Sequence, residues 1–139
     1  MNDKRLQKLT TQLTVLLADA DHFTRPATRN ILNRLGIKIV IEVADGLSAV
    51  ETFRASEPDV VFLDLDLPIF GGVDAIQVMR ARASKACAAA SIFIMADEQR
   101  QKDIPASPDI AGVMTKGAGE SEIARLLALA AQRKRARAE

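Results

Sequence analysis

Five short apolar segments alternate with amphipathic segments along the chain. The apolar segments are rich in Val, Ile and Phe, are bounded by Asp, Gly or Pro, and occupy residues 13–18, 37–43, 60–63, 92–95 and 111–115. Runs of this length and composition favour buried strands over helices. Their nearly continuous apolar character is typical of strands that are covered on both faces.

Helical patterns fill the intervals between these strands. Apolar residues at helical spacing predict helices over residues 24–35, from 45 to shortly before 58, 72–82 and 121–135. For the first helix, Thr24 is a candidate N-cap, Pro26 suits the first turn, and Gly36 suits the end. For the second, Asp45 marks the start.

The interval at residues 97–110 differs from the others. It contains Pro105 and Pro108 and shows no apolar stripe, so we expect the fourth helix of the domain to be short, displaced or absent.

The alternation of strands and helices predicts an α/β fold. Five β-α units in succession favour a doubly wound, five-stranded parallel sheet with helices on both faces. A chain of 139 residues suits one domain, which we place at residues 13–131. Residues 1–12 form an N-terminal extension, either a short helix or an arm, and residues 132–139 form a basic tail.

Composition excludes several classes of function. The net charge of +1 provides no overall field for nucleic acid or an acidic membrane, and no apolar run approaches the ~20 residues of a membrane span. The single cysteine, Cys87, excludes an internal disulfide and a multi-cysteine zinc site. We therefore expect a cytoplasmic protein that binds neither nucleic acid nor membrane, and we assign no role to Cys87 or to His22.

Charged residues follow the predicted strands at their carboxyl ends. Asp19 and Asp21 follow the first strand, Asp64 ends the third, and Lys116 ends the fifth. Ligands of open parallel sheets bind beyond these ends, and two carboxylates there suit Mg²⁺. A carboxylate beside Mg²⁺ and a lysine can act as a nucleophile toward a phosphoryl group.

These residues together resemble the bacterial response-regulator receiver family, in its chemotaxis-regulator-like form. The resemblance rests on Asp19, on Asp64 with Pro68 and Gly72, and on Lys116. It implies a flavodoxin-like sheet of order 2-1-3-4-5. It also implies that a histidine kinase or phosphotransfer protein phosphorylates Asp64 and that Lys116 contacts the phosphate. The implied ligands of Mg²⁺ are Asp19, Asp64 and the backbone carbonyl of Asp66.

The chain departs from the family pattern at several positions. Ala20 stands where the family has a second acid, so we expect weakened Mg²⁺ binding unless a rearranged loop lets Asp21 substitute. Ala96 replaces the usual hydroxyl residue and Val113 the usual aromatic switch residue, so we expect an altered readout of phosphorylation. Gly117 follows the lysine where a proline is common.

Three functional hypotheses follow from these residues. The leading one is a stand-alone receiver, not an enzyme, that signals through contacts with an unknown downstream protein or relays the phosphoryl group. The second is a pseudo-receiver that binds a partner without phosphorylation. The third, based on Asp64-Leu65-Asp66, is a haloacid-dehalogenase-like phosphatase. The oligomeric state, a homodimer included, stays open.

Overall fold

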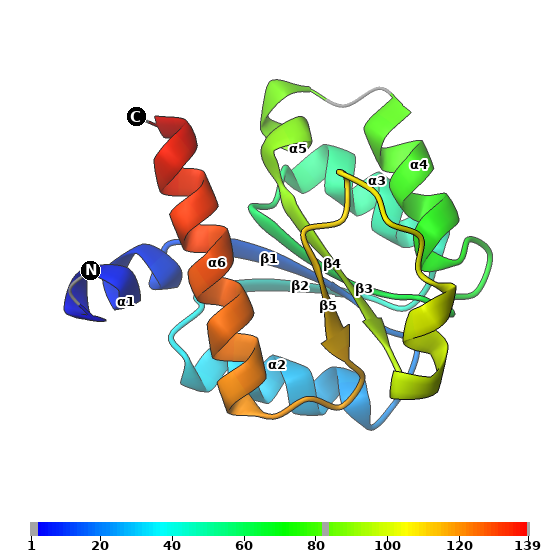
Figure 1. Ribbon diagram of the computed structural model, residues 1–139, viewed down its shortest axis with the longest axis horizontal. Coiled ribbons are helices and arrows are strands. Elements are labelled where there is room, and N and C mark those ends of the chain that lie inside the picture. The colour runs from blue at the N-terminus through cyan, green and yellow to red at the C-terminus, as the bar shows by residue number, and fades with distance from the viewer. Residues whose placement is uncertain (1–2, 82–83, 139) are drawn as a thin grey trace.

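The computed structural model describes residues 3–81 and 84–138, which form a three-layered α/β fold (Figure 1). The five strands are β1 (Thr14–Ala18), β2 (Ile39–Val43), β3 (Val60–Asp64), β4 (Ser91–Ala96) and β5 (Gly112–Thr115). They pair in parallel throughout, in the order β2-β1-β3-β4-β5. The predicted fold class and sheet order are therefore confirmed.

Helices cover both faces of the sheet. The helices on one face are α3 (Gly46–Ser56), α4 (Gly72–Ala81) and α5 (Lys85–Ala89), and those on the other are α2 (Thr24–Arg34) and α6 (Glu120–Ala138) (Figure 1). Successive strand residues point to opposite faces. In β3, Leu63 accordingly packs in the core under α3 and α4, whereas Phe62 packs in the core under α2 and α6. There Phe62 stacks on Phe93, with ring centroids 5.6 Å apart.

Two helices were not predicted by the apolar pattern. Helix α1 (Asp3–Thr11) precedes the first strand and packs against α6, which settles the open alternative for this segment in favour of a helix (Figure 1). Helix α5 lies in an alanine-rich part of the sequence, and the Ser84 hydroxyl caps it by accepting from the Cys87 N–H. Helix α6 also continues through residues 132–138, so these tail residues are helical. Residue 82 of the predicted third helix lies outside the described residues, as do residues 1, 2 and 139.

The predicted N-cap of the first predicted helix, α2, was wrong. The cap position is Phe23, and Thr24 is the first helical residue. The Asp21 carboxylate accepts hydrogen bonds from the backbone N–H groups of Phe23 and Thr24, at 2.7 and 3.0 Å. The Thr24 hydroxyl does not cap the helix and instead donates to the Asp19 carboxylate. Asp45 does cap α3, through the Ser48 N–H, and Gly36 follows α2 at a φ of 92°.

The interval between β4 and β5 contains only a short 3-10 helix, η1 (Glu98–Asp103). This agrees with the expected loss of a regular fourth helix. None of the η1 residues is buried. Among the residues that the structure describes, no helix is both long enough and apolar enough to cross a bilayer.

Candidate functional site

Asp19, Asp64 and Lys116 meet at the carboxyl edge of the sheet. The Lys116 Nζ lies 2.6 Å from the Asp64 Oδ2 and 3.6 Å from the Asp19 Oδ1. Both acids are buried, at 0 % and 3 % exposure. Strand β4 separates β3 from β5, so the long lysine side chain reaches past the end of β4, where Ala96 lies. The structure thus brings together three of the residues that the sequence singled out.

Asp19 is held by donors on both carboxylate oxygens. Its Oδ1 accepts from the Asp21 N–H at 2.9 Å, and its Oδ2 accepts from the Thr24 hydroxyl at 2.5 Å. Its backbone carbonyl accepts from the Arg25 guanidinium at 3.1 Å. The loop after β1 and the first turn of α2 therefore fix the Asp19 carboxylate beside Lys116.

Asp64 is held by its own loop and by the lysine. Its Oδ1 accepts from the backbone N–H of Asp66 at 3.0 Å, while its Oδ2 pairs with Lys116. The start of α4 packs closely against this backbone, because a Cβ at Gly72 would stand only 2.7 Å from the Asp64 carbonyl oxygen. A glycine at this position lets the loop close over the strand end.

Burial and neighbouring charges shift the pKa values of Asp64 and Lys116. Burial raises the pKa of Asp64 above its ordinary value of 3.8, and the nearby Asp19 charge adds to this, against the opposing effects of Lys116 and the Asp66 N–H. Burial alone would lower the pKa of Lys116. Its hydrogen bond to Asp64 and the charges of Asp64, Asp19 and Asp21 outweigh that effect, so the pKa of Lys116 lies above 10.5. Lys116 is therefore positively charged at neutral pH and faces the carboxylates of Asp19 and Asp64.

Ala20 and Asp21, the two loop residues after Asp19, place no free carboxylate at this centre. Ala20 offers no side-chain oxygen, and the Asp21 Oδ1 caps α2. These backbone hydrogen bonds, that from Thr24 first, lower the pKa of Asp21. Within the described ranges, no group of three or more Asp, Glu, His or Cys side chains is arranged to hold a metal. The predicted ligand set thus has two side-chain members, Asp19 and Asp64, with the Asp66 carbonyl as the remaining predicted oxygen.

The Asp66 side chain turns away from the carboxylate centre. Its Oδ2 accepts from the Arg100 Nη1 at 2.9 Å, and 58 % of this side chain is exposed. Sequence reasoning missed both Arg100 and Thr24 as neighbours of the site. Thr24 lies five positions beyond Asp19 and begins α2, so its contact with Asp19 can be inferred only once the start of this helix is known. For Arg100 no sequence signal exists, because the contact depends on how η1 folds back.

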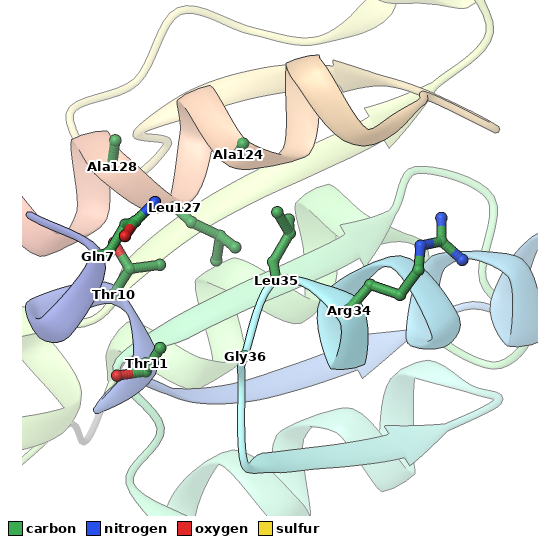
Figure 2. A pocket seen from close by; sticks show the side chains of 9 residues that line it. All are labelled: Gln7, Thr10, Thr11, Arg34, Leu35, Gly36, Ala124, Leu127 and Ala128. Carbon is green, nitrogen blue, oxygen red and sulfur yellow. The ribbon is translucent and has the colours of Figure 1, made fainter. Parts of the chain in front are cut away.

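A cavity of about 520 Å³ lies elsewhere, between α1, the end of α2 and α6 (Figure 2). Figure 2 shows Leu35 and Leu127 at its apolar wall and Gln7 and Thr10 on the α1 side. None of the described residues that line it is acidic. It lies near Thr11 and Gly36, at the amino ends of β1 and β2, whereas Asp19 follows the carboxyl end of β1. The cavity is therefore separate from the acidic centre.

Comparison with known proteins identifies a family over most of the chain. The family model described as "Response regulator receiver domain" matches residues 15–128. Among curated proteins, the response regulator UvrY of Escherichia coli is 33 % identical over 115 residues, which cover 80 % of this chain and 50 % of UvrY. The chemotaxis protein CheY of Thermotoga maritima is 33 % identical over 63 residues, 45 % of this chain and 52 % of that protein. The aligned part of the chain thus spans about half the length of these two relatives.

Solved structures share the fold. The receiver domain of a sensor histidine kinase from Pseudomonas aeruginosa, solved with a magnesium ion coordinated in its active site cleft, has a TM-score of 0.76 at 22 % identity and covers 86 % of this chain and 98 % of that one. A CheY-like receiver domain from Methylobacillus flagellatus has a TM-score of 0.75 at 17 % identity, with coverage of 85 % and 98 %. At these identities the similarity concerns the fold alone.

Proposed function

The chain belongs to the response regulator receiver domain family, a part of two-component signal transduction, and from this premise we propose that Asp64 accepts a phosphoryl group. The donor is a phosphohistidine on a histidine kinase or on a phosphotransfer protein. Receiver domains are phosphoacceptors rather than enzymes, which excludes the phosphatase hypothesis. The observation that carries the proposal is the buried Asp64, held 2.6 Å from Lys116 with Asp19 beside it.

The transfer uses the ionised carboxylate as a nucleophile. A carboxylate oxygen of Asp64 forms a bond to phosphorus while the phosphorus–nitrogen bond of the phosphohistidine breaks. The electron pair of that bond stays on the imidazole nitrogen, which takes a proton from solvent. Lys116 already contacts the reacting carboxylate, so it is placed to neutralise charge on the phosphoryl oxygens as they approach.

We propose that Mg²⁺ binds at Asp19, Asp64 and the backbone carbonyl of Asp66. Two carboxylates facing one lysine leave an excess of negative charge, and hard oxygen donors suit this ion. When bound, the ion supplies positive charge to the phosphoryl oxygens. Ala20 adds no ligand and Asp21 is engaged in capping, so the affinity is lower than that of a receiver with two adjacent acids.

Two exposed apolar side chains near the site support docking of a protein partner. Phe23, at the cap of α2, is 86 % exposed, and Ile69, in the loop after β3, is 69 % exposed. Both lie in loops at the carboxyl edge that carries Asp64. Their exposure fits transfer from another protein and output through protein contacts.

A second candidate function is a phosphorylation-independent pseudo-receiver. It is favoured by the same two-carboxylate centre, since neither Ala20 nor Ala96 has a side-chain oxygen. In this case the helical surfaces bind a partner regardless of the state of Asp64.

Labelling with acetyl phosphate separates the two candidates. The wild type, Asp64→Asn and Asp74→Asn are incubated with radiolabelled acetyl phosphate and Mg²⁺; Asp74 is an acid in the first turn of α4 and serves as the matched control. Label on the wild type and on Asp74→Asn, but not on Asp64→Asn, supports phosphorylation of Asp64. Absence of Asp64-dependent label, with an ordinary receiver labelled in parallel, contradicts it and favours the pseudo-receiver.

A further inference from the structure

The short helix η1 is held next to the site mainly by polar contacts. None of its residues is buried. The Gln101 amide donates to the Ala96 carbonyl and to the Thr115 hydroxyl, each at 3.3 Å, which ties η1 to the ends of β4 and β5. The Arg100 guanidinium provides the contact to the loop after β3. An element held in this way can shift at little energetic cost.

Arg100 pairs with two acids at once. Its Nη1 donates to the Asp66 Oδ2 at 2.9 Å, and its Nε donates to the Asp103 Oδ2 at 2.7 Å. The arginine and both acids are about half exposed, at 47 %, 58 % and 45 % of their side chains. Ion pairs this exposed contribute little to stability, so Arg100 can exchange one of them for a stronger partner.

Asp66 connects Arg100 to the acceptor. The backbone N–H of Asp66 donates to the Asp64 Oδ1 at 3.0 Å, while its side chain holds the guanidinium. Arg100 is therefore anchored on the residue whose backbone already contacts the acceptor carboxylate. Phosphorylation would raise the negative charge on Asp64 from one to about two and add oxygens outside the strand end.

This added charge exceeds what Lys116 alone balances. Lys116 already faces Asp64 and Asp19 together. Arginine is the side chain best suited to a phosphoryl group, because its planar donors bind two oxygens in parallel. Among the described residues around the centre, Arg100 is a cation whose present partner, Asp66, lies two positions from the acceptor.

We propose that Arg100 is a phosphoryl-binding residue, which releases Asp66 and binds the phosphoryl group on Asp64. The exchange draws η1 toward the acceptor and changes the hydrogen bonds that Gln101 makes with the ends of β4 and β5. The state of Asp64 is thus reported at η1, although Ala96 carries no hydroxyl group. This inference rests on the proposed phosphorylation of Asp64.

A titration with beryllofluoride and Mg²⁺, followed by amide and arginine Nε–H NMR signals, tests the exchange. Beryllofluoride mimics a phosphoryl group on a carboxylate without a labile bond. The proteins are the wild type, Arg100→Gln, Lys102→Gln, Asp66→Asn and the double variant Asp66→Asn/Arg100→Gln. Lys102→Gln removes the same charge from the same exposed turn and is the matched control.

Arg100→Gln should lower the beryllofluoride affinity about threefold to tenfold and abolish the shifts of the amides at residues 98–104, while the amides at residues 65 and 66 still respond. Lys102→Gln should behave as the wild type. Asp66→Asn should raise the affinity by about twofold to fivefold, since Arg100 no longer has to leave an ion pair. This gain should vanish in the double variant.

Three outcomes would overturn the inference, and they can be distinguished. If Arg100→Gln binds beryllofluoride as the wild type does and its η1 amides still shift, Arg100 does not contact the group, although the proposed function stands. If the gain of Asp66→Asn persists in the double variant, it comes from reduced repulsion and not from exchange. If the wild-type amides beside Asp64 never respond, the proposed function itself fails and the inference fails with it.

Discussion

The surroundings of Asp64 disfavour its charged form. Only 3 % of the residue is exposed, and the Asp19 carboxylate faces the same lysine. Burial therefore raises the pKa of Asp64 despite the ion pair with Lys116. A carboxyl group whose pKa is higher in the folded state destabilises the fold once it ionises. The charged form of Asp64 is thus a cost to stability that cation binding can relieve.

Asp64→Asn should therefore raise the thermal unfolding temperature by a few degrees at pH 7 in the presence of a chelator. Below the unfolded-state pKa, near 3.8, both proteins carry a neutral side chain and the difference should be small. As the pH rises from there through the raised folded-state pKa, the wild type loses stability relative to the variant, and above it the difference is constant. Melting curves across this pH range measure the effect.

The matching control is the same pair of melts with Mg²⁺. The ion should stabilise the wild type and leave Asp64→Asn nearly unchanged, because binding stabilises only a fold that holds the ligand. A variant less stable than the wild type at pH 7 in chelator would show that the Lys116 ion pair outweighs burial, against our interpretation.

Asp21 has a different task from Asp19, although only one residue separates them. Its carboxylate caps α2, and its lowered pKa means that this contribution is present above the unfolded value and is lost as the pH falls through the folded value. Asp21→Ala should lower the unfolding temperature by a few degrees at neutral pH. It should weaken Mg²⁺ binding by no more than about threefold, the effect of one nearby exposed charge.

Asp19→Ala provides the comparison. It should weaken Mg²⁺ binding about tenfold or more, as expected for loss of a ligand. Isothermal titration of Mg²⁺ into both variants measures the two affinities. An equal loss in Asp21→Ala would show that Asp21 replaces the acid missing at position 20.

At the scale of elements, the loop after β3 packs against the start of α3 beside the site. The Gly46 N–H at the start of α3 donates to the Pro68 carbonyl in the loop after β3, at 3.0 Å. A Cβ at Gly46 would stand 2.2 Å from the Phe70 carbonyl oxygen and 2.6 Å from its Cβ. The loop that follows Asp64 is thus seated on the first turn of α3, and the absence of a side chain at Gly46 permits this contact.

Gly46→Ala should destabilise the fold by about 1–3 kcal/mol, because backbone atoms would have to move apart. Urea unfolding measures the loss. Since the displaced loop carries Asp66, the same variant should also shift the NMR signals of residues 64–66.

Gly119→Ala is the matched control, because a Cβ added at Gly119 would meet nothing within 4 Å. Its effect on unfolding should be about 0.5 kcal/mol or less, the difference between glycine and alanine at a helix start. Equal losses in the two variants would contradict the steric explanation.

At the scale of the whole molecule, α1 and the carboxylate site lie at opposite ends of β1. Helix α1 leads into the amino end of β1 and packs on α6, whereas Asp19 follows the carboxyl end of the same strand (Figure 1). Leu9 of α1 packs against the core between the sheet and the helices α2 and α6. The family match begins only at residue 15. We therefore expect α1 to support the domain without taking part in its chemistry.

A chain that starts at Gln12 should keep the folded sheet and lose stability by about 1–3 kcal/mol, from the loss of apolar contacts such as that of Leu9. Its affinity for Mg²⁺ should equal that of the full chain. Urea unfolding and Mg²⁺ titration check the two statements. A truncated chain that is unfolded, or that binds Mg²⁺ differently, would contradict the predicted division at residue 12.

The strands could be predicted from the sequence because they depend on local hydrophobic patterns. Buried parallel strands produce apolar runs, and the runs predicted the five strands to within two residues at each end. The positions of Asp64 and Lys116 followed from strand ends, since all carboxyl ends of a parallel sheet lie at one edge. The sheet order came from the family resemblance. Helix α5 escaped prediction because an alanine-rich stretch has no apolar periodicity.

The sequence by itself therefore determined which elements form and which charged residues reach the carboxyl edge, since both follow from positions counted along the chain. Tertiary structure decided what each side chain does there. Lys116 and Asp64 are 52 residues apart, and Arg100 and Asp66 are 34 apart. Whether such groups meet depends on how β4, η1 and the loops are placed in space. Asp64, the proposed acceptor, could be predicted from its place at the end of a strand, but the contact between Arg100 and Asp66 came only from the folded chain.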